Sequence, residues 1–453
     1  MADLSFPLSS TPGALAGEGE GRLINCAIEK QGERHVIRRV PGLVSAYSAG
    51  QSTPRGFTLG PSSEPYGAFN GVAVRSTTLL SGSLPGTDLV TWAMNNKSGT
   101  PDLVAVREGG GAYVVSTTTV SAYPDADLPS GSANSVAFLG GFFIFSISDG
   151  RIFASQLNST DINALSFGSA ETAPDGLKRG IVHANTYYAM GATTIEPWLN
   201  AGTSPFPLRR ATSVIPFGLL TAAAVAGHEQ GFGGNPVFVA SDGTVREILG
   251  YEAKKVSTVA VERFIALSTT SSLEACVYTS RGRQVWVLSS DIGSWEYNVA
   301  NGSWNERASA GDVRWRGSRS MQNSAGGWYI GDRSSTSVLQ ISDPTRTENG
   351  SALTPTWESG PLKAYPAREV IPALFADLTD AAATVTMSYS KDGGATWTTP
   401  ATGSLANADL YPVRWNRLGR ATHHGLRVRF SIADAVDFAF LSASVPDLQI
   451  RKP

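Results

Sequence analysis

Short apolar runs separated by tight-turn residues recur along the whole chain. The clearest copy is Phe142–Phe153, where Phe-Phe-Ile-Phe is followed by a Ser-Asp-Gly turn and a second apolar run. Asp-Gly between β-forming residues favours a hairpin, because both residues tolerate the backbone angles of a tight turn. Related turns are centred near residues 109, 191, 242, 282 and 333. Their spacing of about 40–50 residues is the length of one four-stranded propeller blade.

This spacing predicts an all-β fold with a six- or seven-bladed β-propeller at residues 61–350. A sheet of three or four short strands cannot bury both of its faces alone, so blades stack around an axis and cover one another. Residues 1–60 are punctuated by glycine and proline, and we interpret them as an N-terminal arm or a closing strand. Unrelated hairpins in one or two sandwiches are the alternative.

The hairpin rhythm ends near residue 350, and longer strands follow. Alternating runs at 383–390, 425–432 and 438–445 indicate a separate domain at residues 355–453. Alternating strands in a segment of this length favour a β-sandwich-like fold. We find no convincing amphipathic helix, and residues 158–164 favour at most one helical turn.

Composition narrows the class of protein without changing this fold. The 453 residues include 48 glycines and 25 prolines, and 16% of them are charged, which is typical of an all-β chain with many turns. The net charge of −2 disfavours a general nucleic-acid binder, which usually carries a basic excess. Cys26 and Cys276 are expected to be buried thiols. Neither a signal peptide nor a membrane span is recognisable, so we expect synthesis in a reducing compartment and no membrane partner.

One turn in the C-terminal segment follows a known pattern. Ser390–Trp397 fits the Asp-box sequence Ser-x-Asp-x-Gly-x-Thr-Trp, which occurs several times in sialidase propellers. We expect a structural turn, in which side-chain oxygens bond backbone groups and the tryptophan packs beneath the hairpin. Its residues are Ser390, Asp392, Gly394, Thr396 and Trp397.

Five tryptophans lie close together in the sequence: Trp286, Trp295, Trp304, Trp315 and Trp328. Aromatic packing between blades is one interpretation, and a sugar-binding platform is the other. With the Asp box, the platform supports an alternative function as a glycan-binding or sialidase-like propeller. The arginines are scattered along the chain, so the arginine cluster of a sialidase cannot be assigned.

No residue pattern predicts catalysis, a cofactor or a metal. The five histidines lack metal-ligand spacing, and neither a nucleophile elbow nor a phosphate-binding glycine loop occurs. We therefore assign no catalytic, cofactor-binding or metal-binding residue and expect a protein that is not an enzyme.

Two segments are candidates for partner contact. A late basic stretch alternates with apolar residues, and we interpret it either as partner-facing or DNA-facing or as an exposed strand face with a loop, on which Arg427 and Arg429 would point outward. Its candidate residues are Arg414, Arg417 and Arg420. The long connection at 200–236 is a candidate interface loop. Its candidate residues are Phe206, Phe232 and Asn235.

Four short passages, taken in order, resemble the tail nozzle proteins of short-tailed, podovirus-type phages. These proteins are also called packaged-DNA stabilisation or tail hub proteins. The passages are Val40-Pro41-Gly42, Glu171-Thr-Ala-Pro174-Asp175-Gly176-Leu177, Ala192-Thr-Thr-Ile195-Glu196-Pro-Trp198, and Trp415-Asn-Arg417-Leu-Gly419-Arg420 with Gly425-Leu-Arg427-Val. The N-terminal arm and most loops depart from the family, and loops decide which partner docks.

The resemblance implies a structural protein of the virion tail, made in the host cytoplasm and without catalysis. It implies a homo-oligomeric ring, expected to be hexameric, below the portal adaptor, which is the head-to-tail connector. The ring would form the exit channel for double-stranded DNA, without sequence specificity, and would retain packaged DNA. Tail spikes or fibres and a needle or plug are the further partners that the resemblance implies. A generic interaction scaffold inside a cell is the remaining rival.

Overall fold

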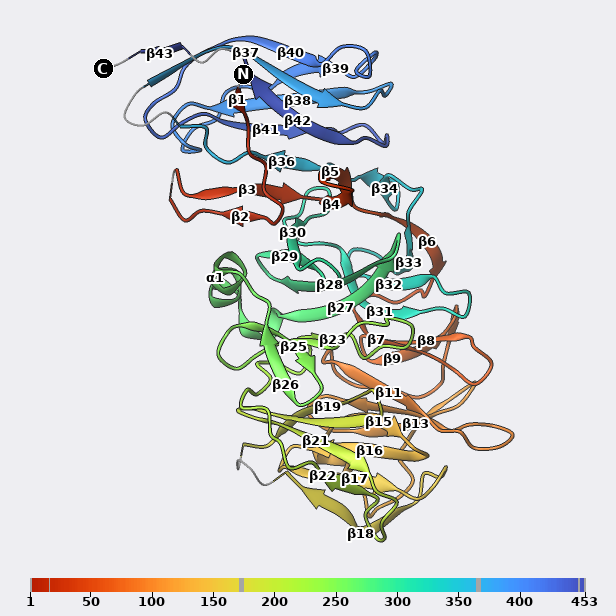
Figure 1. The fold of residues 1–453 in the computed structure, drawn as a ribbon. Coiled ribbons are helices and arrows are strands. Elements are labelled where there is room, and N and C mark those ends of the chain that lie inside the picture. Colours follow the sequence, from red (N-terminus) through yellow and green to blue (C-terminus); the bar gives the residue numbers. More distant parts are fainter. Residues whose placement is uncertain (1, 16, 171–174, 364–367, 447–448, 452–453) are drawn as a thin grey trace. The chain divides into compact units, whose positions relative to one another are not determined.

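The structure is a computed structural model that describes residues 2–15, 17–170, 175–363, 368–446 and 449–451 (Figure 1). The chain is nearly all β and forms two compact units, which we describe separately. The propeller unit contains residues 45–291 and 316–341. The terminal unit contains residues 1–44, 292–315 and 342–453.

Seven inner strands form a ring in the propeller unit. They are β7 (Pro54–Leu59), β11 (Val90–Met94), β15 (Ala133–Leu139), β19 (Leu177–His183), β23 (Val225–Ala226), β27 (Glu274–Ser280) and β31 (Gly317–Gln322). Contacts run in succession from β7 to β19, and from β23 through β27 and β31 back to β7. The Arg179 side chain spans the remaining step and donates to the Val225 carbonyl at 3.3 Å. The predicted propeller is therefore confirmed, with seven blades.

Each of the first five inner strands begins a four-stranded antiparallel sheet. The outer strands are β8 (Pro65–Phe69), β9 (Val72–Arg75), β10 (Thr78–Leu79), β12 (Leu103–Arg107), β13 (Ala112–Val115), β14 (Val120–Ala122), β16 (Phe142–Ile147), β17 (Arg151–Ser155), β18 (Ile162–Ser169), β20 (Thr186–Gly191), β21 (Ile195–Asn200), β22 (Leu208–Arg210), β24 (Val237–Val239), β25 (Val245–Leu249) and β26 (Glu252–Lys255). β27 pairs with β28 (Arg283–Ser290), and β31 pairs with β32 (Trp328–Asp332), which pairs with β33 (Ser337–Ser342). The Ser-Asp-Gly turn of the sequence analysis connects β16 to β17.

The start of the propeller unit lies beside its last blade. β6 (Gly42–Ser48) ends here, and the Ala49 N–H donates to the Thr336 carbonyl at 2.9 Å. The Tyr47 and Tyr329 rings meet edge to face with centroids 5.7 Å apart. The N-terminal side of the chain thus reaches the blade next to β7, which is the place where a closing segment is needed.

Neighbouring blades share their apolar cores. Val104 of β12 packs with Phe143 and Phe145 of β16, and all three side chains are fully buried. Ile181 of β19 packs in the same way with Val225 and Phe238 of the next blade. Each blade therefore depends on its neighbours to remove its faces from water.

Hydroxyl groups join the inner strands at three places by accepting hydrogen bonds from backbone N–H groups of a neighbouring strand. The pairs are Thr91 with Val136 (2.9 Å), Ser135 with Gly180 (2.8 Å) and Ser320 with Val277 (3.0 Å). A β-bulge precedes both Ser135 and Ser320 in their strands. Bulges change the direction of the side chains that follow them.

Two sheets form the terminal unit. The first has the order β4-β5-β42-β37-β40, with β1 beside β42 and β43 beside β37; the second includes β29-β30-β3-β36-β41-β38-β39, with β2 beside β3. The bounds are β1 (Ala2–Asp3), β2 (Thr11–Pro12), β3 (Gly19–Ile24), β4 (Cys26–Gln31), β5 (Arg34–Arg39), β29 (Gly293–Asn298), β30 (Ser303–Arg307), β36 (Thr356–Glu358), β37 (Arg368–Leu378), β38 (Thr384–Ser390), β39 (Ala401–Ser404), β40 (Val413–Arg420), β41 (Arg427–Ser431), β42 (Phe440–Val445) and β43 (Gln449–Arg451), with a small hairpin of β34 (Thr347–Glu348) and β35 (Ser351–Ala352).

Both sheets of the terminal unit contribute to one core, as the predicted sandwich requires. Trp357 of β36 is fully buried and contacts Phe430 of β41 and Phe440 of β42, with ring centroids 5.6 Å and 5.3 Å apart. Leu4 and Leu23 belong to the same core. Figure 1 shows the red strand β3 beside β36, with which it pairs.

Three features differ from the sequence analysis. α1 (Val259–Leu267) is a nine-residue helix that begins at the cap Thr258, and it buries Val261, Phe264 and Ile265. Residues 158–164 contain no helix and lead into β18. The compact units also do not follow the predicted division into 1–60, 61–350 and 355–453, because β3 and β30 pair within the terminal unit. Among the described residues, no helix is long and apolar enough to cross a membrane.

The hydroxyl contacts between blades predict a measurable loss of stability. Ser135→Ala leaves the Gly180 N–H without its acceptor, and a buried unpaired amide costs about 1–3 kcal/mol. Urea unfolding followed by tryptophan fluorescence should show this decrease in the free energy of unfolding. Ser83→Ala, at an exposed serine, is the control and should change it by less than about 0.5 kcal/mol. Equal effects of the two substitutions would contradict the role of Ser135.

Candidate functional site

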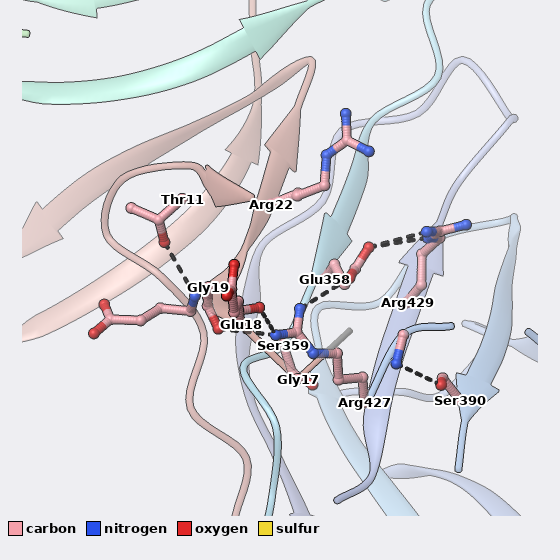
Figure 2. A network of polar contacts seen from close by, with 12 residues as sticks. Thr11, Gly17, Glu18, Gly19, Arg22, Glu358, Ser359, Ser390, Arg427 and Arg429 are labelled. Carbon is pink, nitrogen blue, oxygen red and sulfur yellow. Dashed lines mark hydrogen bonds and ion pairs between the residues drawn. The ribbon is translucent and has the colours of Figure 1, made fainter. Parts of the chain in front are cut away.

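A buried arginine holds the N-terminal segment in the terminal unit (Figure 2). Arg427 of β41 is 4% exposed, and its guanidinium lies 3.4 Å from the Glu358 carboxylate of β36. The same guanidinium donates to the backbone carbonyls of Glu18 and Gly19, with a distance of 2.9 Å to Gly19. Arg429 donates to the other Glu358 oxygen at 3.0 Å. One ionic cluster therefore joins strands that are more than 300 residues apart in the sequence.

The placement of Arg427 on an exposed strand face is wrong. β41 lies between β36 and β38, so it has a neighbouring strand on each side. The N-terminal segment covers the side chain of Arg427. The alternation of apolar and polar residues along β41 could not predict this cover, because the covering residues come from a distant part of the chain. Arg429 is partly exposed, and its guanidinium lies over the Trp397 ring, 3.9 Å from the ring centroid.

A second ion pair joins the N-terminal segment to β30. Arg22 donates from Nε to Glu306 Oε1 at 3.0 Å, and the Ser10 hydroxyl donates to the same oxygen at 2.7 Å. The hydrogen bond to Glu306 raises the pKa of Arg22, so the guanidinium stays charged. Residues 292–315 are thereby connected to the start of the chain.

A third cluster lies around Arg307, whose side chain is completely buried. Its guanidinium lies 2.9 Å from Glu348 and 3.5 Å from Glu296, and Trp315 Nε1 donates to Glu348 at 3.0 Å. Arg307 also donates to the Pro41 carbonyl at 2.9 Å. The first passage of the family resemblance, Val40-Pro41-Gly42, is thus held by a buried charge.

The Asp-box turn is built from its own side chains. Asp392 accepts from the Thr396 N–H at 2.9 Å and from the Thr396 hydroxyl at 2.6 Å, and the Ser390 hydroxyl accepts from the Gly394 N–H at 2.7 Å. Burial alone would raise the pKa of Asp392, but the hydrogen bonds from Thr396 and Ser390 together lower it to about 2. The turn places Trp397 beside Arg429.

The remaining candidates lie apart from these clusters. Arg414, Arg417 and Arg420 are exposed on β40, which is the last strand of its sheet. Cations on such an edge also discourage pairing with other chains. Within the propeller unit, Phe206 is half-buried against Trp198, with ring centroids 5.9 Å apart.

Two of the predicted interface residues, Phe232 and Asn235, make contacts within the propeller unit. Phe232 is 1% exposed and packs edge to face on Trp328, so its prediction as a contact residue is wrong: the loop turns this ring inward. Asn235 donates to Glu247 at 2.8 Å.

The passage at 171–177 lies partly outside the described residues, but its Asp175 accepts from the Thr193 N–H and hydroxyl, at 2.5 Å and 2.7 Å. The second and third passages of the resemblance therefore meet in the structure.

The tryptophans offer no platform for sugars. Trp286, Trp304, Trp315 and Trp328 are at most 1% exposed, and Trp295 is 5% exposed. The sugar-platform interpretation is therefore wrong, because a stacking sugar needs an accessible ring face. Aromatic packing explains these residues instead.

A cavity of about 440 Å³ lies where the inner strands of the propeller meet. Its polar lining residues include Arg179, His228, Glu229 and Arg319. Arg179 donates to the Ala222 carbonyl at 2.9 Å, and Arg319 lies 3.3 Å from Glu274. Tyrosine does not occur among the described lining residues of this cavity. Within the described part of the chain, no three His, Cys, Asp or Glu side chains are grouped to hold a metal ion.

A family model described as "Bacteriophage P22 Gp10, beta-propeller" matches residues 69–345, which is more than half of the chain. The chain belongs to this family. The resemblance to podovirus-type tail nozzle and stabilisation proteins is therefore confirmed, and the protein is a phage tail structural protein. Membership of the Gp10 family implies a structural rather than an enzymatic role and a place in the virion.

Other comparisons add little to the Gp10 assignment. No curated protein matches the chain. Similar solved structures include the computationally designed Ika8 protein (13% identity, 75% of this chain and 99% of that chain, TM-score 0.39), the WD40 propeller domain of Doa1 (13%, 67% and 96%, 0.38) and BamB from Moraxella catarrhalis (9%, 69% and 92%, 0.39). At these TM-scores the likenesses carry no argument about function.

Breaking the ionic cluster around Glu358 should strongly lower the free energy of unfolding. Arg427→Met leaves buried carbonyls and part of a buried carboxylate unpaired, which costs about 3–5 kcal/mol. Urea unfolding of the full chain should show this loss, and Arg414→Met, at an exposed arginine, should change stability by less than about 0.5 kcal/mol. Arg427→Met combined with Glu358→Leu should cost less than the sum of the single changes. Additive costs would show that the pair is not coupled.

The buried His228 predicts that the stability of the propeller unit depends on pH. Burial lowers its pKa to about 4, with Glu229 opposing and Arg179 and His183 adding to the shift. The unfolded chain, with a pKa of 6.5, binds the proton more readily, so stability should fall as the pH drops from about 6.5 to about 4. His228→Gln should flatten this dependence, whereas His35→Gln, at an exposed histidine, should not. An unchanged slope in His228→Gln would contradict the assignment.

Proposed function

We propose that this Gp10-family protein is a subunit of the tail nozzle or hub ring below the portal adaptor. Copies of the chain form a homo-oligomeric, hexameric ring around the DNA exit channel. The ring retains packaged DNA until ejection and anchors tail spikes or fibres and a needle or plug. Family membership over residues 69–345 is the observation that carries this proposal.

The propeller suits a part that must resist pressure from packaged DNA. Its seven inner strands close into a ring, and neighbouring blades share cores such as that of Val104 and Phe143. Deforming the ring would expose these faces to water and break contacts such as that of Ser135 with Gly180. Function is therefore mechanical and requires no reacting group.

The terminal unit is built from three separate segments of the chain. Its three chain segments are tied by the clusters around Glu358, Glu306 and Arg307. A pull on the N-terminal segment would have to separate buried opposite charges, which is costly when one partner is left alone. We infer that this unit is suited to transmit load between neighbouring parts of a tail.

The net charge of the chain is consistent with a channel through which DNA passes without being bound tightly. The chain carries a net charge of −2, and the exposed arginines at 414, 417 and 420 are a small group on one strand. Tight, non-specific DNA binding usually needs a much larger basic excess. Double-stranded DNA is therefore proposed as a transient occupant of the channel.

Sedimentation velocity tests the proposed assembly. The purified chain, alone and mixed with its phage's portal–adaptor complex, should form a closed ring of about six copies in at least one of the two conditions. The adaptor complex mixed with an unrelated propeller of similar mass is the control. A chain that stays monomeric and does not co-sediment with the adaptor would contradict the proposal.

A further inference from the structure

A groove of about 660 Å³ lies on the terminal unit, beside the Asp-box turn. Three aromatic side chains line it, Tyr389, Trp397 and Trp415, together with the polar side chains of Thr398, Thr399 and Asn416. Apolar walls with a few oriented polar groups are typical of small-ligand sites. The tail role proposed above makes no use of this groove.

Trp397 is fixed in position by two independent contacts. The Asp392–Thr396 bonds close the turn that precedes it, and Arg429 lies over one face of its ring at 3.9 Å. Arg429 is itself held by Glu358 at 3.0 Å. Since one face of the indole is covered by Arg429, the opposite face is the one that a ligand can stack on.

The polar groups of the groove are neutral. The Thr398 hydroxyl accepts from the Tyr389 N–H at 3.1 Å and keeps its own hydrogen for donation. Thr399 and Asn416 are exposed at the groove and offer both donors and acceptors. No carboxylate occurs among the described lining residues. Such groups match the hydroxyls of sugar rings, each of which both donates and accepts.

Two cationic residues lie next to lining residues of the groove. Lys391 Nζ lies 5.5 Å from the centroid of the Tyr389 ring. Arg417 is exposed on β40 between the lining residues Asn416 and Leu418. These positive charges favour a ligand that carries negative charge at its edge.

We propose that this groove binds an acidic oligosaccharide, with one sugar ring stacked on Trp397 and carboxylates directed toward Lys391 and Arg417. Thr398, Thr399 and Asn416 bond the sugar hydroxyls. The Asp-box turn thus contributes a binding residue in addition to its structural role. The inference rests on the terminal unit alone and is independent of the assembly into a tail ring.

Isothermal titration calorimetry on the full chain tests this inference. The probes are trigalacturonic acid, α2,8-linked trisialic acid, the neutral trisaccharide cellotriose and the oligonucleotide dT10. At least one acidic trisaccharide should bind at least tenfold more tightly than cellotriose. Trp397→Ala should weaken that binding at least tenfold, and Tyr411→Ala, an aromatic side chain 73% exposed outside the groove, should leave it unchanged.

A second pair of variants separates loss of binding from loss of folding. Thr399→Ala and Asn416→Ala change exposed side chains, so they should keep the melting temperature of the wild type and still weaken binding threefold or more. Three results would overturn the inference. These are no binding of either acidic trisaccharide at about 10 mM, binding that Trp397→Ala does not change, or a Trp397-dependent preference for dT10.

Discussion

A four-stranded blade cannot remove both of its apolar faces from water, and this constraint shapes the propeller unit. Each blade must therefore be covered by its neighbours, and the row of blades must close. Closure is visible in the shared cores, such as Ile181 with Val225, and in the contact between β31 and β7. Hydroxyls such as that of Ser135 satisfy backbone groups where the inner strands meet. Rigidity is thus a consequence of closure, and the proposed role in retaining packaged DNA depends on it.

Local signals predicted most of the fold. The Asp-Gly turn at 149–150 determines its hairpin within a few residues, and blade length follows from the spacing of such turns. The turn near 282 lies between the first and second strands of its blade, whereas the turns near 109, 149, 191, 242 and 333 lie between the second and third. α1 was missed because nine residues with three buried positions give a weak periodic signal.

The sequence could not predict contacts between residues that lie far apart along the chain. Arg427 alternates like an exposed residue, and only the folded chain brings Glu18, Gly19 and Glu358 to it. Phe232 lies in a loop whose composition suggests a surface, yet its ring packs on Trp328. The Asp-box turn was predictable because all of its bonds lie within eight residues, but the Arg429 that covers Trp397 comes from another strand. Sequence patterns therefore located the turns and strands, whereas the ionic clusters of the terminal unit required the structure.

The central proposal is that this Gp10-family protein holds DNA inside the particle as part of the tail. The most direct measurement is the DNA content of purified phage particles assembled with and without the protein. The account predicts that heads fill normally in its absence but lose their DNA during purification, and that adding the purified protein to freshly filled heads prevents the loss. Particles that lack the protein and yet retain full-length DNA would contradict the claim.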